Sequence, residues 1–186
     1  VARALPRLER ALGRATALTR NVLDYGKTEE PEPQLKRVAL GPALTAAAQD
    51  AGLDHSELKL VRHLPARLSV TADPDQLHRI LVNLMRNARQ ALTDTPEALS
   101  GTRPPRLEVS AEVRGPRVHI RLEDNGPGIP PRIEEKLFKP FVSGSGREGS
   151  GLGLTISREL AEAQGGSLRL VSTGPQGTRF ELVLAA

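Results

Sequence analysis

The sequence predicts an α+β domain of two layers, with helices on one face of a sheet, preceded by one long helix. Three observations predict this fold class. Residues 107–113 and 118–122 alternate between apolar and other side chains and are joined by Arg-Gly-Pro, as in an antiparallel hairpin. Residues 73–92 instead carry apolar side chains at helical spacing. Predicted strands outnumber predicted helices, which favours helices packed on one sheet face.

The amino-terminal segment predicts a separate helix. Apolar or small residues recur over residues 5–22 at alternating three- and four-residue spacing, and a second row runs beside them. A stripe this wide is typical of a helix in a bundle, whereas packing on its own domain is the alternative. Gly26 then ends the helix, and an acidic, proline-interrupted linker follows. We expect a hairpin helix at residues 1–27, a linker at 28–35 and the main domain at 36–186.

The remaining elements follow from periodicity and turn residues. Asp73 and Pro74 are typical of a helix N-cap and first turn, so the helix over residues 73–92 begins there. A polar connection separates it from the alternating strands. The sequence predicts further strands at residues 37–40, 58–64, 67–72, 167–172 and 178–185, and further helices at 41–50, 133–138 and 152–164.

Composition excludes several classes of protein. The 186 residues, 38% hydrophobic and 26% charged, fit one globular domain with an appendage. The sequence holds no apolar run of about 20 residues, no signal peptide and no cysteine. It begins at Val1 rather than Met, so we expect a fragment whose missing part holds any membrane anchor.

The net charge of +4 is concentrated in residues 1–27, which hold six basic and two acidic residues. A DNA-binding domain is expected to carry its basic face on the folded body, which is formally neutral here. Aromatic residues make up 2%, which argues against stacking platforms for single strands. The pattern favours an acidic protein partner and no nucleic acid.

Two asparagines form the first candidate site. Asn83 and Asn87 are four residues apart and share one face of the predicted helix. Asparagine is a mediocre helix former, so their presence needs an explanation. Side-chain carbonyl oxygens suit Mg²⁺, which completes its octahedron with phosphates and water. Taken alone, hydrogen bonding to nearby loops is the better-supported alternative.

A glycine-rich loop over residues 144–154 leads directly into a helix. Its backbone N–H groups and the positive end of the helix dipole suit a phosphate. The string is weak evidence alone, because it lacks the Gly-Lys-Ser/Thr ending of a P-loop and no strand feeds into it.

Asp124 ends a predicted strand and is followed by Gly126 and Gly128. A carboxylate there can accept a hydrogen bond from an exocyclic amine such as N6 of adenine. Glycine leaves room for a flat base against the backbone. Alone, Asp-Asn-Gly indicates only a turn.

In this order the motifs resemble the ATP-binding domain of sensor histidine kinases, whose Bergerat fold is shared with gyrase, heat-shock and mismatch-repair ATPases. The resemblance rests on five strings: NLMRNARQAL at 83–92, DNGPGI at 124–129, LFKPF at 137–141, GSGLGL at 149–154 and GTRF at 177–180. It covers the chain from about residue 36, and the first helix resembles the second helix of a dimerisation hairpin. It implies a two-layer α/β sandwich with helices on one face of a mixed sheet.

The resemblance also implies ATP and Mg²⁺ as cofactors and assigns a role to each site residue. Asn87 is the metal ligand, with Asn83 supporting the same site. Asp124 holds the adenine amine, with Gly126 and Gly128 under the ring and Thr178 near it. Phe138 and Phe141 anchor a lid over residues 142–150, and the phosphates are covered by Gly149, Gly151, Leu152 and Gly153.

Two departures concern charge and catalysis. Many family members carry lysine at the position of Gln90, so the cationic role falls here to Arg89 or Arg147. Hydrolysing relatives carry a water-activating glutamate at the position of Asn83. An amide cannot act as a general base, so we expect phosphoryl transfer and weak ATP hydrolysis.

The family's phosphoacceptor histidine string is absent from this sequence. His55 matches it superficially but lies in a predicted loop, so we expect the acceptor upstream of Val1. The other three histidines, at 63, 78 and 119, are interpreted as structural or surface residues.

The resemblance implies the catalytic domain of a two-component histidine kinase, which passes phosphate through an upstream histidine to a response regulator receiver domain. It further implies a homodimer through the helical hairpin and a cytoplasmic kinase portion, with any membrane contact made by upstream segments. Two alternatives stay open. The missing acceptor leaves room for a non-catalytic pseudokinase or phosphotransfer scaffold. A Bergerat ATPase or serine kinase is disfavoured by the hairpin helix and the amide at position 83.

Overall fold

The computed structural model describes residues 31–54, 58–93, 104–142 and 151–186. In chain order these residues form β1 (Lys36–Ala39), α2 (Leu40–Asp50), β2 (Lys59–His63), β3 (Ser69–Ala72), α3 (Pro74–Thr93), β4 (Arg106–Arg114), β5 (Arg117–Asp124), α5 (Pro131–Glu134), α6 (Gly153–Ala163), β6 (Ser167–Gly174) and β7 (Gly177–Ala185). The predicted hairpin helix lies outside them. None of the helices in these ranges is both long and apolar enough to cross a lipid bilayer.

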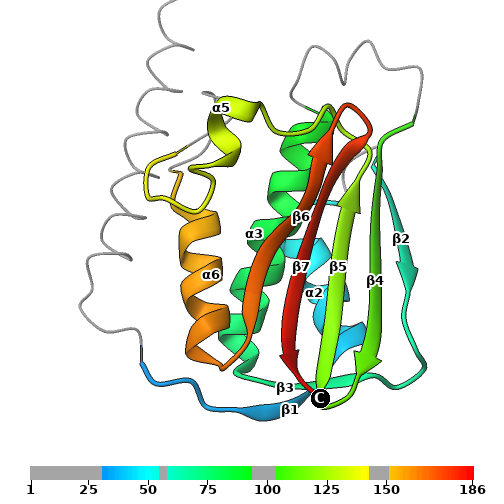
Figure 1. The fold of residues 1–186 in the computed structure, drawn as a ribbon. Helices are drawn as coiled ribbons and strands as arrows, with labels where there is room; N and C mark the ends of the chain where they lie inside the picture. The colour runs from blue at the N-terminus through cyan, green and yellow to red at the C-terminus, as the bar shows by residue number, and fades with distance from the viewer. Residues whose placement is uncertain (1–30, 55–57, 94–103, 143–150) are drawn as a thin grey trace, which may run out of the picture.

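The strands form a single mixed sheet (Figure 1). Its order is β1-β3-β7-β5-β4-β2, with β6 paired to β7. The β2–β4 pair is parallel and the other pairs are antiparallel. The β4–β5 hairpin has the predicted turn, and the β5–β7 register places Asp124 opposite Thr178. That register brings together two site residues far apart in the sequence.

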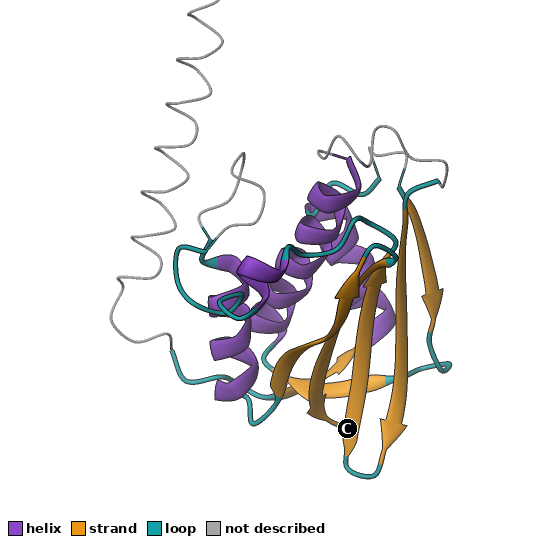
Figure 2. Ribbon diagram, turned by 45° about the horizontal axis from the view of Figure 1, so that its top comes forward, coloured by secondary structure: helices purple, strands orange, loops and turns teal. Residues whose placement is uncertain are grey.

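Helices cover one face of the sheet, so the predicted fold class is confirmed (Figure 2). Alternate residues of the central strands point into the core, and Ile120 and Leu182 are fully buried. The apolar stripe of α3 packs on them, with Leu77 and Leu81 also fully buried. Because α3 lies between α2 and α6, its position over the sheet is fixed from both sides.

The start of α3 is capped as predicted. Oδ1 of Asp73 accepts hydrogen bonds from the backbone N–H groups of Asp75 and Gln76, both at 3.0 Å. Its Oδ2 accepts one from the N–H of Gln34 at 2.9 Å. The Gln76 bond, helped by the other two, lowers the pKa of Asp73 in spite of partial burial. One carboxylate therefore caps the helix and ties the end of the linker to the domain.

Several element boundaries differ from the prediction by one or more residues, and two of these differences have a clear physical reason. The short helix predicted at 133–138 is observed at Pro131–Glu134, because prolines favour the first turn of a helix and Pro131 occupies it. Leu40, predicted to end the first strand, instead begins α2; its N–H donates to the carbonyl of Leu68 and its side chain is fully buried.

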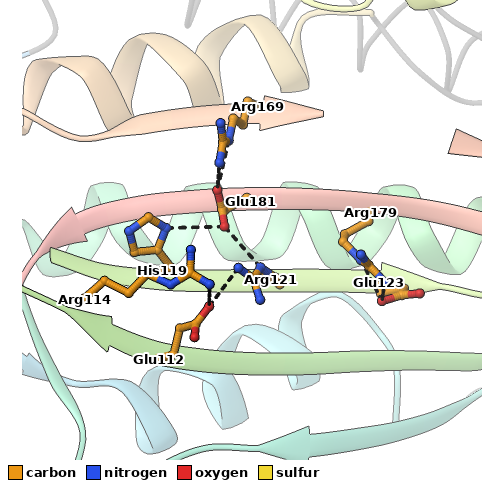
Figure 3. A network of polar contacts seen from close by, with 8 residues as sticks. All are labelled: Glu112, Arg114, His119, Arg121, Glu123, Arg169, Arg179 and Glu181. Carbon is orange, nitrogen blue, oxygen red and sulfur yellow. Dashed lines mark hydrogen bonds and ion pairs between the residues drawn. The ribbon is translucent and has the colours of Figure 1, made fainter. Parts of the chain in front are cut away.

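The face of the sheet away from the helices carries a network of charged side chains (Figure 3). Its centre is Glu181, whose side chain is only 2% exposed. Oε1 accepts hydrogen bonds from Arg169, and Oε2 accepts one from Nε of Arg121 at 3.1 Å and lies 3.3 Å from Nδ1 of His119. Burial opposes ionisation, but these hydrogen bonds outweigh it and lower the pKa of Glu181.

Candidate functional site

Most of the candidate residues that the structure describes lie on elements that meet at one end of the molecule. There the carboxyl end of β5, the turn between β6 and β7, the carboxyl half of α3 and the amino end of α6 come together (Figure 1). The strands supply Asp124 and Thr178, and the helices supply the asparagines and the glycine-rich turn. The described parts of the five quoted motifs thus lie on elements that come together on one side of the fold.

Asp124 is the last residue of β5 and is 6% exposed. Its Oδ1 accepts hydrogen bonds from the N–H of Gly126 at 2.9 Å and of Thr178 at 3.3 Å. No described residue donates a hydrogen bond to its Oδ2. Burial raises the pKa of Asp124 to about 6, although these two hydrogen bonds oppose the rise. One oxygen is therefore held by the protein and the other is left as an acceptor.

The glycines beside Asp124 are required by the protein's own packing. A Cβ on Gly126 would lie 2.9 Å from Oδ1 of Asp124. Gly128 has a φ of 81°, and its Cβ would lie 2.3 Å from the carbonyl oxygen of Gly174 in the β6–β7 hairpin. Both glycines therefore allow the loop after β5 to close onto the sheet, and the space for a base that the sequence predicts beside them stays a prediction.

Sequence reasoning missed three residues that hold this loop. A Cβ on Gly177 would lie 1.8 Å from the carbonyl oxygen of Asp124. Asn125 accepts a hydrogen bond from the N–H of Arg106 at 2.7 Å, and Thr173 accepts one from the N–H of Ile129 at 2.7 Å. Gly177 stands in the quoted GTRF string, so its position before Thr178 was the available signal. The other two depend on partners distant in sequence.

Asn83 lies on the side of α3 that faces α6. Its Nδ2 donates to the carbonyl of Gly153 at 3.4 Å and to Oγ of Ser157 at 3.2 Å. Asn87 lies one turn further along the same face and is half-buried. Among the described residues, none is hydrogen-bonded to its carboxamide. The two amides therefore differ: Asn83 is oriented by the protein, and Asn87 is left for another partner.

The turn that begins α6 is closely packed. Gly151 has a φ of 67°, and its Cβ would lie 2.6 Å from backbone atoms of Phe141 and Val142. Leu152 is fully buried, and Gly153 is the first residue of α6. The two ends of the segment between 142 and 151 thus touch through backbone atoms. Gly149 and Arg147 lie outside the described residues.

The two phenylalanines occupy different environments. Phe138 packs edge-to-face on Phe180, with ring centroids 6.5 Å apart, and the guanidinium of Arg158 lies 5.2 Å from its ring centre. The carbonyl of Phe138 accepts a hydrogen bond from Thr155 Oγ1 of α6 at 3.2 Å. Phe141 is 61% exposed. Of the two predicted anchors, Phe138 is packed into the domain.

Arg89 does not converge with the asparagines. A Cβ on Gly52 would lie 3.5 Å from its Nη1, so the guanidinium reaches toward the end of α2 rather than toward α6. This placement does not support Arg89 as the cation that replaces the family's lysine. It leaves Arg147 as the remaining candidate of the two.

The described residues contain no group of three His, Asp or Glu side chains that could hold a metal ion by themselves. The donor set at this end consists of neutral amide oxygens and one buried carboxylate. Such a set suits an ion that receives most of its ligands from phosphates and water, as Mg²⁺ does. The residues therefore fit a magnesium–nucleotide complex better than a free metal ion.

A surface groove of about 600 Å³ lies elsewhere, between α5, α6 and β6. It is bounded by Phe138, Arg158 and Leu168 and does not include Asp124 or the asparagines. Of the candidate residues that the structure describes, the groove shares only Phe138.

Fold and site together define an ATP-binding α+β domain. Residues 72–186 match the family of histidine kinase-, DNA gyrase B- and HSP90-like ATPases, and the chain belongs to that family. The resemblance seen in the sequence is confirmed.

Curated relatives are sensor kinases. The chain is 40% identical over 131 residues to the sensory histidine kinase/phosphatase NtrB of Escherichia coli O157:H7, covering 68% of this chain and 37% of NtrB. It is 30% identical over 151 residues to the C4-dicarboxylate transport sensor protein DctB of Rhizobium meliloti, covering 81% of this chain and 22% of DctB. The chain thus spans well under half of these relatives.

Solved structures with the same fold are histidine kinases. Full-length ShkA in complex with AMPPNP superposes with a TM-score of 0.75 at 24% identity, over 99% of this chain and 40% of ShkA. The mycobacterial sensor histidine kinase MprB superposes with a TM-score of 0.65 at 24% identity, over 81% of this chain and 97% of that structure. These similarities support the fold.

Proposed function

We propose that this domain binds Mg²⁺–ATP at the Asp124 end of the fold and serves as the catalytic part of a two-component histidine kinase. In this proposal the γ-phosphate passes to a histidine located upstream of this chain and then to a response regulator receiver domain. The observation that carries the proposal is the buried Asp124 carboxylate, with one oxygen fixed by backbone N–H groups and the other left as an acceptor.

Each residue contributes to binding and orientation. Oδ2 of Asp124 accepts the hydrogen bond of the adenine amine, and the β6–β7 turn supports the loop that carries it. The carboxamide oxygen of Asn87 would be a ligand of Mg²⁺, with Asn83 supporting the same site, and the bound ion would neutralise phosphate charge. Backbone N–H groups at the start of α6 point toward the same end and suit phosphate oxygens.

Phosphoryl transfer is favoured over hydrolysis by the side chain at position 83. A water molecule needs a general base to become an effective nucleophile, and the Asn83 amide, with both N–H groups donated to α6, cannot take a proton. A histidine nucleophile supplied by another domain needs no such base here. Positioning and charge neutralisation are then the main contributions of this domain.

The segment to which we assign protein partners, residues 1–27, lies outside the residues that the structure describes. We propose that residues 1–27 pair with a second copy of the chain and that their basic excess attracts an acidic response regulator. Because ATP and receiver domains are cytoplasmic, we propose that this domain works in the cytoplasm.

Replacing Asn87 by alanine tests the metal assignment. ATP affinity should fall about tenfold to hundredfold in the presence of Mg²⁺, since a ligand of a charged ion is lost, and should change little in EDTA. Titration calorimetry under both conditions measures this. Arg86→Ala, an exposed neighbour on the same helix, is the control. An equal loss with and without metal would remove Asn87 from the metal site.

A further inference from the structure

Ser157 is a fully buried polar residue that has no role in the proposed binding of nucleotide and metal. It lies in the second turn of α6, and its side chain is 0% exposed. Its Oγ accepts a hydrogen bond at 3.2 Å from Nδ2 of Asn83, which also donates to the carbonyl of Gly153 at 3.4 Å. A buried hydroxyl costs free energy unless it is hydrogen-bonded, and alanine is the better helix former. The Asn83 contact accounts for a serine at this position.

The two contacts decide which atom of the Asn83 amide is the nitrogen, although a Cβ on Gly153 would lie 3.5 Å from Oδ1 and 3.8 Å from Nδ2. A carboxamide has two N–H donors on nitrogen and only acceptor lone pairs on oxygen. The Gly153 carbonyl can only accept, so the group beside it must be Nδ2. With both N–H groups directed to α6, rotation of the amide would break two hydrogen bonds. Oδ1 then remains as an acceptor, and none of the described residues is hydrogen-bonded to it.

We propose that Ser157 is a positioning residue for the metal site: together with the Gly153 carbonyl it holds the Asn83 amide so that Oδ1 is presented to Mg²⁺. This inference rests on the proposed function. Ser157 itself does not contact metal or nucleotide. It makes the orientation of a metal-facing side chain on α3 depend on the docking of α6, so the two helices must be packed correctly before the oxygen is in place.

The same stretch of α6 offers a matched control. Thr155, two residues earlier and 6% exposed, directs its hydroxyl to the carbonyl of Phe138 and not to Asn83. Thr155→Val removes a buried hydroxyl of the same helix while keeping the shape of the side chain. It should reproduce any general loosening of α6 without releasing the Asn83 amide.

The experiment compares the wild-type chain, Ser157→Ala and Thr155→Val by titration calorimetry with ATP, in Mg²⁺ and in EDTA. We expect Ser157→Ala to bind ATP about fivefold more weakly in Mg²⁺, as for the loss of one neutral hydrogen bond, and with unchanged affinity in EDTA. Thr155→Val should keep the wild-type ratio of the two affinities.

A second readout needs no nucleotide. The side-chain amide signals of Asn83 in an NMR spectrum, assigned as the pair missing in Asn83→Ala, should exchange with water several-fold faster in Ser157→Ala than in the wild type. If wild-type binding gains from Mg²⁺ but Ser157→Ala keeps the whole gain, the inference is overturned and the proposed function stands. If Ser157→Ala and Thr155→Val change the ratio of ATP affinities in Mg²⁺ and EDTA to the same extent, Ser157 contributes only to the packing of α6 and the inference is overturned. If wild-type binding ignores Mg²⁺, both proposals fall.

Discussion

Replacing Asp124 by alanine should weaken ATP binding by at least about a hundredfold while leaving the domain folded. Hydrogen bonds to charged groups contribute about 1.5–3 kcal/mol each, and a buried amine left without its acceptor adds a desolvation penalty. The substitution removes the only carboxylate among the candidate binding residues and leaves the N–H groups of Gly126 and Thr178 without their acceptor. ATP binding is therefore weakened both because the adenine amine loses its acceptor and because two backbone N–H groups of the site lose theirs.

The measurement is titration calorimetry with ATP and with GTP, which carries an oxygen in place of the adenine amine. The wild-type chain should prefer ATP strongly, and Asp124→Ala should lose most of that preference. Circular dichroism and thermal unfolding serve as controls for the fold. An ATP affinity equal to that of the wild type, in a folded variant, would refute the adenine role of Asp124.

The raised pKa of Asp124 adds a pH dependence to the same prediction. The ionised carboxylate is the better acceptor for an amine, and its pKa in the free protein is about 6. Binding of adenosine, which has no titrating phosphate, should be constant above that pH and should weaken below it, because the proton must then be released. Asp124→Asn should bind weakly and without this titration.

The folding stability of the domain should depend on pH in the opposite sense to adenosine binding. Because burial raises the pKa of Asp124 from 3.8 to about 6, the folded state binds more protons than the unfolded state between these values. The contribution of Asp124 to the free energy of unfolding therefore falls as the pH rises from 3.8 to about 6, and it stays low above that pH. Asp124→Asn avoids this cost and should be more stable at pH 8 by about 1–3 kcal/mol. A site that binds ATP is here maintained at the expense of stability.

Local patterns account for what the sequence could predict. Strict alternation identified β4 and β5 with their turn, because the pattern of a half-buried strand is readable within one segment. The Asp73 cap was readable for the same reason. The five ordered strings then pointed to Asp124 and to the asparagines, which the fold does bring to one end.

Contacts between distant segments could not be predicted. The β5–β7 register sets Thr178 against Asp124 across 54 residues of sequence, and nothing in either strand alone specifies it. Ser157 is a single serine in a helix and carries no pattern. Arg89 depends on the same kind of contact: its charge suits a phosphate, but its guanidinium lies beside Gly52 at the end of α2. Glu181 lies in a strand that the sequence predicted, but nothing in that strand alone indicates that its carboxylate is buried.

Replacing Glu181 by glutamine should destabilise the domain by about 1.5–3 kcal/mol, because charge-assisted hydrogen bonds to a buried carboxylate are lost. The side chain is 2% exposed and accepts hydrogen bonds from Arg169 and Arg121 on two neighbouring strands (Figure 3). A neutral amide can accept from one of these but presents an N–H group to the other. Arg169 on β6 then loses its charged partner across β7, whereas Arg121 on β5 keeps Glu112.

Glu123→Gln is the matched control on the same face. Glu123 pairs with Arg179, but both side chains are well exposed, at 47% and 39%, so this pair should contribute at most about 1 kcal/mol. Urea unfolding at pH 7 measures both variants. Because the pKa of Glu181 is lowered in the folded state, its contribution is complete above 4.5 and is lost as the pH falls through the folded pKa. The difference between wild type and Glu181→Gln should therefore shrink in acid, and equal costs for the two variants at pH 7 would mean that the cluster acts as ordinary surface pairing.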